Sequence, residues 1–320
     1  MRSFSELHEI IENELADLYY PSTPKNLYDP IKYVLNIGGK RIRPILMLLS
    51  HQLFSEDIEK SLKAALGIEV FHNFTLLHDD IMDKAPLRRG LQTVHEKWDN
   101  NTSILSGDTM LVNSFDLISQ VEHNHIRKIL EVFNKSAIEV CKGQQWDMDF
   151  EKREDVTLSE YLKMIEYKTS VLLAASLQIG GINGGASAEQ QVHLYEFGKN
   201  IGIAFQLKDD LLDAFGNPEK FGKKVGGDIL VNKKTFLYLK AIQLANEFQK
   251  KQLIQLFSGL NNENKVDEVK SIFSDLNIQK HTLDLIKAYY IKAMKHLDAI
   301  NSDKKEPLFN FAEKIKERIV

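Results

Sequence analysis

Two short segments decide how this sequence folds: Leu77-His78-Asp79-Asp80-Ile81-Met82-Asp83 and Leu207-Lys208-Asp209-Asp210-Leu211-Leu212-Asp213. Each lies in an apolar run with helical periodicity, so the first and last aspartates of each segment share one helix face. Like charges on one face destabilise a helix by about 0.2–0.5 kcal/mol per pair, and Asp is a poor helix former. Because this unfavourable pattern occurs twice, it indicates a cation between the carboxylates. All-oxygen ligands suit Mg²⁺, which shares its shell with waters and substrate phosphates.

The composition is that of a soluble globular protein built mainly from helices. The chain has 320 residues, of which 43% are hydrophobic and 27% are charged, and its net charge of −4 gives no global signature of nucleic-acid binding. It contains 17 Gly and 7 Pro, a low proportion that favours helix. The single Cys141 excludes an internal disulfide and fits a reducing compartment.

No part of the sequence has the pattern of a targeting or membrane-spanning segment. The N-terminus leads into an acidic amphipathic stretch that lacks the apolar core of a signal peptide. The apolar runs at residues 45–49 and 171–182 are short or interrupted, and a transmembrane helix needs roughly 18 apolar residues. We therefore expect a soluble, cytoplasmic protein.

Helical periodicity runs along the whole chain, and glycines and prolines punctuate it. The pattern predicts the all-α fold class, with a single domain over residues 1–320 and no alternating set of strands. Loops are expected at Gly180–Gly185 and at Phe221–Asp228, where glycines gather. The expected helices span residues 6–19, 28–36, 44–51, 59–83, 104–121, 126–147, 158–180, 188–215, 233–257, 264–275, 281–299 and 306–318.

Basic residues cluster where anions are expected beside such metals. The segment Gly38-Gly39-Lys40-Arg41-Ile42-Arg43-Pro44 puts flexible backbone and three basic residues before a helix N-terminus, which is typical of an anion site. Arg88-Arg89-Gly90 follows the first aspartate segment. The second aspartate segment is followed by Lys223, Lys224, Lys233 and Lys234. The sequence thus predicts sites for two diphosphates, one bound through Mg²⁺ and one bound directly.

Taken together, these motifs resemble those of the trans-type isoprenyl diphosphate synthases (polyprenyl synthetases), and the likeness spans essentially the whole chain. Six elements match in the family's order. They are Gly39–Pro44, the first aspartate segment with Arg88-Arg89-Gly90, Gly143-Gln144 with Asp147, Lys168-Thr169, Phe205-Gln206 with the second aspartate segment, and Gly222-Lys223 with Gly226-Gly227-Asp228 through Lys233.

The resemblance implies a role for each matching residue. Three Mg²⁺ ions would bind with the allylic diphosphate to Asp79, Asp83 and Asp209, supported directly or through waters by Asp80, Asp210 and Asp213. The same diphosphate would contact Arg88, Lys223 and Lys233. The diphosphate of isopentenyl diphosphate would be held by Lys40, Arg43, His72 and Arg89. Catalytic groups would be Asp80 beside the metals and, along the reacting carbons, Lys168, Thr169 and Gln206.

The same resemblance implies a large helical bundle of the isoprenoid synthase type with a central active-site cavity. It also implies a homodimer, with an interface around residues 104–145. The reaction would be an ionisation in which Mg²⁺ and cationic side chains stabilise the departing diphosphate. Isopentenyl diphosphate would then attack the allylic cation, with the released diphosphate as a plausible base and with water excluded.

Product length is expected to depend on the helix that carries Asp79. Phe74 lies five residues before Asp79, about 7.5 Å along a helix axis, and Phe71 lies further down. In similar enzymes an aromatic residue at this position floors the product tunnel, which suggests a product of C15 to C20. The smaller Thr75 leaves room for C20.

Other functions fit parts of the pattern. A class I terpene cyclase also ionises an allylic diphosphate, but its second metal motif typically mixes Asn, Ser or Thr with Glu, and it needs no second diphosphate site. A helical His/Asp phosphohydrolase would need further histidines at suitable spacing. A non-catalytic subunit of a heteromeric synthase would usually lack one aspartate motif. Among single residues, His78 could simply bond a neighbouring helix, and Lys224 and Lys234 could be solvated companions of Lys223 and Lys233.

Overall fold

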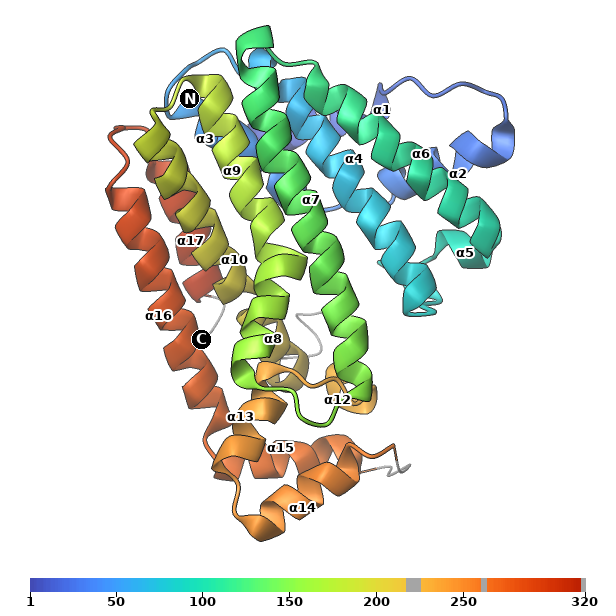
Figure 1. Ribbon diagram of the computed structural model, residues 1–320, viewed down its shortest axis with the longest axis vertical. Coiled ribbons are helices and arrows are strands. Elements are labelled where there is room, and N and C mark those ends of the chain that lie inside the picture. Colours follow the sequence, from blue (N-terminus) through green and yellow to red (C-terminus); the bar gives the residue numbers. More distant parts are fainter. Residues whose placement is uncertain (217–225, 260–263, 318–320) are drawn as a thin grey trace. The chain divides into compact units, whose positions relative to one another are not determined.

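The computed structural model describes residues 1–216, 226–259 and 264–317, and helices dominate them (Figure 1). The all-α prediction is therefore confirmed. The chain divides into two compact units. Unit 1 comprises residues 1–134, 175–194 and 301–308, and unit 2 comprises residues 135–174, 195–300 and 309–320. The single domain over residues 1–320 stays a prediction.

Unit 1 is built around a helix that is buried on every side. Its elements are α1 (Phe4–Ala16), α2 (Lys25–Asn36), α3 (Ile42–Gln52), α4 (Glu59–Met82), β1 (Leu87–Arg88), β2 (Leu91–Gln92), α5 (Val94–Lys97), α6 (Asn100–Ser119), the start of α7 (His123–Lys152), the end of α9 (Val171–Gly184) and the starts of α10 (Ala188–Phe215) and α17 (Glu306–Glu317). Residues 64–71 of α4 are all buried, as a helix that is apolar around its whole circumference should be. A Cβ added at Gly67 would lie 2.9 Å from the Ser114 carbonyl oxygen, so α4 and α6 pack at close range.

The predicted loop at Gly180–Gly185 is wrong, because α9 (Val171–Gly184) continues through it. These glycines let two helices touch. A Cβ added at Gly180 would overlap the Met47 carbonyl of α3, and one at Gly184 would lie 2.7 Å from the His51 carbonyl oxygen. The turn comes only at Gly185, whose φ is +93°.

Unit 2 carries the second aspartate segment on its longest helix apart from α7. Its elements are the end of α7, α8 (Leu158–Ile165), the π-helical turn η1 (Glu166–Ser170), the start of α9, most of α10 (Ala188–Phe215), α12 (Gly227–Leu230), α13 (Phe236–Leu244), α14 (Glu247–Leu256), α15 (Lys265–Asp275), α16 (Ile278–Asp298) and most of α17 (Glu306–Glu317). The predicted helix over 233–257 is wrong, since the chain becomes extended at Ala245 and Asn246 starts α14 with a capping box. The predicted helix over 158–180 is interrupted by η1, and Gly227 and Asp228 begin a helical turn rather than a loop.

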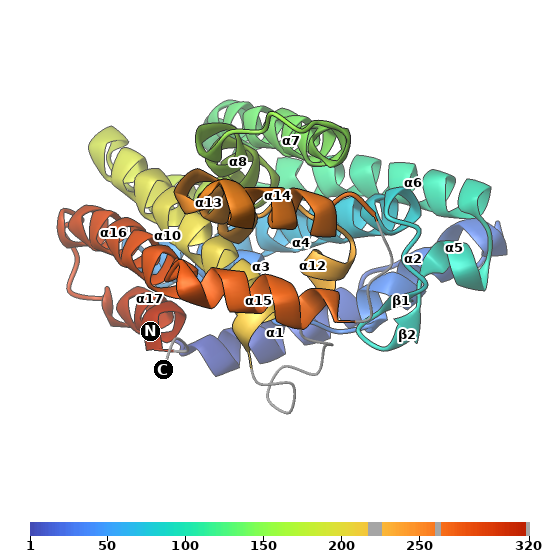
Figure 2. The ribbon, with the colours of Figure 1, turned by 90° about the horizontal axis from the view of Figure 1, so that it is seen from below.

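A short antiparallel hairpin follows α4 in unit 1. Leu87 pairs with Gln92 and Arg88 pairs with Leu91, and the hairpin lies beside α2 and α5 (Figure 2). The Tyr33 hydroxyl of α2 donates to the Gln92 carbonyl at 2.8 Å, which ties the hairpin down. Within the described ranges, no helix is long and apolar enough to cross a bilayer.

Candidate active site

The last turn of α4 carries the first aspartate segment out of the core of unit 1. Asp83 caps the helix, and its amide donates to the Asp79 carbonyl at 2.8 Å. This i to i+4 bond puts Asp79 and Asp83 one turn apart on one face, as the spacing predicts. Their environments differ, because Asp79 is half-buried and Asp83 is exposed. Asp80 between them is buried.

Asp80 is held by an arginine of the hairpin. Arg88 donates from Nε and Nη2 to the Asp80 carboxylate at 2.7–2.9 Å, the two-pronged geometry of a strong arginine–carboxylate pair. The structure thus separates Asp80 from its two neighbours. Asp80 ties the hairpin to α4, while Asp79 and Asp83 lie on the outer face of the turn.

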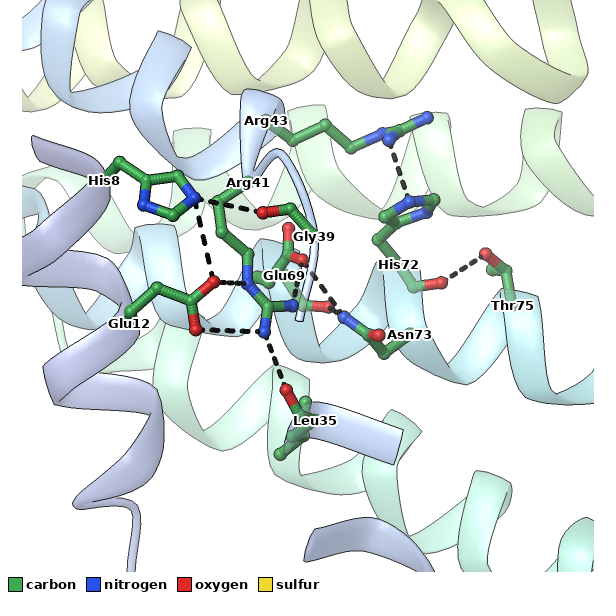
Figure 3. Close-up of polar contacts among 10 residues, drawn as sticks. All are labelled: His8, Glu12, Leu35, Gly39, Arg41, Arg43, Glu69, His72, Asn73 and Thr75. Carbon is green, nitrogen blue, oxygen red and sulfur yellow. Dashed lines mark hydrogen bonds and ion pairs between the residues drawn. The ribbon is translucent and has the colours of Figure 1, made fainter. Parts of the chain in front are cut away.

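A second polar pair joins α4 to α3, and its α4 member, His72, lies two turns before Asp79. Arg43 Nη1 lies 2.9 Å from Nε2 of His72 (Figure 3). Burial and the Arg43 charge hold the pKa of His72 well below its usual value, so the ring is neutral and accepts this bond. Burial also lowers the pKa of Arg43 to about 10. Arg43 Nε is buried with no acceptor among the described residues, so an anion would complete the pair. We call Arg43 and His72 the anion pair.

Arg89 joins the anion pair from the hairpin side. Its guanidinium lies so close to Gly39 that an added Cβ there would be 2.7 Å from Nη1. Burial and then the nearby Arg41 charge lower the pKa of Arg89. Lys40, next to Gly39, is exposed. Of the four residues assigned to the isopentenyl diphosphate subsite, the structure brings Arg43, His72 and Arg89 together around one loop.

The face of α4 that carries His72 continues to the metal motif. His72 and Asp79 are seven residues apart, which is two turns and about 10 Å along the axis. Unit 1 alone therefore places an anion pair and a carboxylate pair about 10 Å apart along the axis of α4.

An aromatic cluster adjoins that line. Phe74 and Phe71 are buried with ring centroids 5.5 Å apart, and Phe71 meets Phe133 of α7 at 5.1 Å. The Thr75 hydroxyl donates to the His72 carbonyl at 2.8 Å. His78 packs against Phe74 and lies 3.3 Å from the Ile104 carbonyl oxygen, which agrees with its expected bond to a neighbouring helix.

In unit 2, α10 carries the second aspartate segment, and its first two aspartates differ in burial as Asp79 and Asp80 do. Asp209 is exposed and Asp210 is buried. Asp210 accepts hydrogen bonds from the Tyr161 hydroxyl and from Gln206 Nε2, the latter at 3.1 Å. Thr169 donates to the carbonyl oxygen of the same Gln206 side chain at 3.1 Å. Hydrogen bonds therefore connect the predicted catalytic residues Thr169 and Gln206 to Asp210 of the metal motif.

Charge accumulates around Asp210 because α12 starts beside it. Burial, and then the charge of Asp228, raise the pKa of Asp210 to about 7. Burial likewise raises the pKa of Asp228 to about 6. The Asp228 amide donates to the Asp213 carboxylate at 2.9 Å, so Asp213 fixes the start of α12. In both segments the second aspartate is buried and bonded to the protein.

A carboxylate in unit 2 holds two of the predicted cationic residues. Lys168 Nζ lies 2.6 Å from Asp147 Oδ2, and Lys233 Nζ lies 3.6 Å from the same oxygen. Asp147 is 15% exposed; burial alone would raise its pKa, but Lys233 and Lys168 together lower it. A Cβ at Gly143 would collide with the Lys168 backbone, so Gly143 lets η1 approach α7 closely enough for this contact.

Three further residues organise unit 2: Asp147, Tyr161 and Asp228. The sequence motifs contain Asp147 and Asp228 but assign them no site role, and no sequence signal points to Tyr161, whose partner Asp210 is 49 residues away. The description of Lys234 as solvated is wrong, since its ammonium donates to the Phe150 and Glu151 carbonyls at 2.8 and 3.0 Å near the end of α7. Lys223 and Lys224 lie outside the described residues.

The carboxylates fit a metal ion whose remaining ligands come from water and from the substrate. Within the part of the chain that the structure describes, no group of three or more His, Cys, Asp or Glu side chains forms a metal site by itself. Mg²⁺ typically takes one or two carboxylates and completes its shell with waters and phosphates. Pairs such as Asp79 and Asp83 match that requirement.

Comparisons with known proteins agree with this geometry. Residues 24–276 match the family model described as "Polyprenyl synthetase". The chain is 42% identical to the geranylgeranyl diphosphate synthase of Methanosarcina mazei, over 73% of this chain and 72% of that protein. It is 38% identical to the short chain isoprenyl diphosphate synthase of Methanocaldococcus jannaschii, over 97% and 94%. A crystal structure of a geranylgeranyl pyrophosphate synthase matches with a TM-score of 0.94 and 43% identity, over 99% of each chain.

Proposed function

Because the chain belongs to the polyprenyl synthetase family, we propose that it makes a C20 prenyl diphosphate from isopentenyl diphosphate and an allylic diphosphate. It is a short-chain isoprenyl diphosphate synthase, and its relatives of this type match along nearly the whole chain. The observation that carries the proposal is the anion pair two turns before Asp79. A cyclase ionises a single diphosphate and has no use for this second, direct anion site.

Each diphosphate has its own set of side chains in this proposal. The anion pair, Arg89 and Lys40 bind isopentenyl diphosphate through charge-assisted hydrogen bonds. Arg88, Lys223 and Lys233 contact the allylic diphosphate. Lys168, Thr169 and Gln206 lie along the reacting carbons, where the hydroxyl and carbonyl dipoles face positive charge on the allylic carbon. The buried aromatic cluster around Phe74 keeps water from that carbon.

Enzymes of this family use a divalent metal. We propose three Mg²⁺ ions held by Asp79, Asp83 and Asp209, with Asp210 and Asp213 in support. When bound, these ions neutralise the charge that develops on the departing diphosphate. Asp80 acts through its bond to Arg88, which sets the position of that guanidinium beside the metal motif.

The function is tested by incubating the protein with Mg²⁺, isopentenyl diphosphate and C5, C10 or C15 allylic primers. We expect elongation to C20 from each primer, and chromatography of the dephosphorylated products measures chain length. In the same assay, we expect elongation to stop when a chelator removes the metal. No elongation from any primer would reject the synthase, and cyclic hydrocarbons formed without isopentenyl diphosphate would favour the cyclase.

Product length provides a second prediction. Phe74→Ala is expected to shift the main product beyond C20, because it removes a buried ring close to Asp79. Phe74→Leu should give a smaller shift with less loss of stability, since a buried Phe→Ala change costs about 3–5 kcal/mol. Phe248→Ala, at a 75% exposed position on α14, is the matched control. An unchanged product distribution in both Phe74 variants would contradict the proposed floor.

We also propose a homodimer and a cytoplasmic location. Support for the dimer comes from α6, which exposes large apolar side chains on its outer side. Their exposed fractions are 45% for Ile104, 59% for Leu105, 68% for Val112 and 36% for Phe115. Apolar side chains that recur along one helix are typical of a helix–helix interface between subunits.

A further inference from the structure

The central arginine of the basic loop points away from the anion pair and into unit 1. The Arg41 side chain is fully buried, although Lys40 before it is exposed. Its guanidinium makes four hydrogen bonds (Figure 3). Nε and Nη2 donate to the Glu12 carboxylate at 2.8 and 3.3 Å, Nη1 donates to Glu69 at 2.8 Å, and Nη2 donates to the Leu35 carbonyl at 2.7 Å.

These bonds join the loop to three helices. Glu12 lies on α1, Leu35 in the last turn of α2, and Glu69 on α4. Asn73, one turn after Glu69, donates to the same Glu69 oxygen at 3.1 Å. We call Arg41, Glu12 and Glu69 the Arg41 clamp. Because Asn73 directly follows His72, the clamp is connected along α4 to the anion pair.

The backbone is strained at Arg41 itself, two residues before Arg43 of the anion pair. Arg41 has φ 45° and ψ 36°, the left-handed region that a non-glycine residue rarely adopts. Such a conformation persists only where surrounding contacts hold it in place. Here those contacts are the four bonds of Arg41 and a contact of 3.0 Å between His8 Nε2 of α1 and the Gly39 carbonyl oxygen.

The clamp also supplies negative charge close to the guanidinium groups of Arg43 and Arg89. Two carboxylates face one guanidinium, which leaves an excess of one negative charge beside Arg43 and Arg89. Burial lowers the pKa of both arginines, and Glu69 acts against this effect at each of them. The excess charge therefore lets Arg43 and Arg89 stay close together and protonated before any anion is bound.

We propose that Glu12 and Glu69 are positioning residues for isopentenyl diphosphate. Acting through Arg41, they hold the Gly38–Arg43 loop in its binding shape and make α1 part of that subsite. The inference rests on the proposed function, since it concerns the substrate that the anion pair takes. Neither carboxylate touches the substrate.

The test compares Glu12→Gln and Glu69→Gln, which keep side-chain size and remove one charge each. We expect the KM for isopentenyl diphosphate to rise about 10–100-fold and the KM for the allylic diphosphate to change less than about twofold. Calorimetry without Mg²⁺ or primer should show the same loss of isopentenyl diphosphate binding in the absence of turnover. The double variant should lose less than the product of the two single losses, because both residues act through Arg41.

The matched control is Glu14→Gln on α1, the helix of Glu12, where the carboxylate pairs with Lys63 at 3.5 Å on the surface. It should leave both KM values unchanged. Arg41→Lys keeps the charge but cannot form the fork, and it should reproduce the selective loss if the glutamine variants fold poorly. The positioning role would be rejected if Glu12→Gln and Glu69→Gln raised both KM values equally. It would also be rejected if they lowered the melting temperature but left isopentenyl diphosphate binding unchanged. A parent protein that elongates no primer would instead reject the proposed function.

Discussion

Asp79→Asn and Asp209→Asn are each expected to lower kcat for prenyl elongation by about 10³-fold or more. Each replacement keeps the size of the side chain and removes the negative charge that a magnesium ion needs. Electrostatic stabilisation of a leaving group is usually the largest catalytic contribution, and loss of one such group costs about 10²–10³-fold. A missing metal ligand should exceed that range, because the metal ion itself is then bound less tightly.

Steady-state assays over a range of Mg²⁺ concentrations measure this effect. Both variants should need more Mg²⁺ to reach half of their residual rate. Asp275→Asn is the matched control, since Asp275 is exposed in the last turn of α15 and belongs to neither aspartate segment. If Asp79→Asn and Asp209→Asn proteins elongate at the parental rate, the carboxylates do not hold the catalytic metal.

Helix positions followed from the sequence wherever one face or the whole circumference was apolar. The expected helix over 188–215 coincides with α10, and that over 59–83 differs from α4 by its last residue. The failures occur where a residue's partner is remote in sequence. Gly180 looked like a turn because nothing local shows that the Met47 carbonyl of α3 would occupy the space of its side chain.

The site shows the same division between local and remote information. Spacing placed Asp79 and Asp83 on one face, since helix geometry is a local property. It could not show that the second aspartate of each segment is bonded to the protein, Asp80 to Arg88 and Asp210 to Tyr161. Nor could spacing show that Arg41 points toward Glu12 and Glu69 while Arg43 points toward His72, because these partners lie on other helices.

Lys168→Met is expected to lower kcat by about 10²–10³-fold, the scale for loss of one preorganised charge. Lys168 lies in the π-helical turn η1, and Asp147 holds its ammonium at 2.6 Å. In the proposed mechanism this ammonium lies beside the reacting carbons, and its charge stabilises the negative charge that develops on the diphosphate as it departs. Lys163→Met is the control, because Lys163 lies one turn earlier, is exposed and pairs with Glu166 at 2.9 Å. Parental kcat in Lys168→Met would remove this lysine from the mechanism.

Asp147→Asn separates position from charge at the same site. It leaves both lysines present but without their shared anion, so we expect a smaller loss in kcat, about 10–100-fold, as for other residues that orient a reacting group. Combining it with Lys168→Met identifies the lysine through which Asp147 acts. A double variant no slower than Lys168→Met alone would mean that Asp147 acts through Lys168. Losses that multiply would assign its effect to Lys233, whose ammonium lies 3.6 Å from the same carboxylate oxygen.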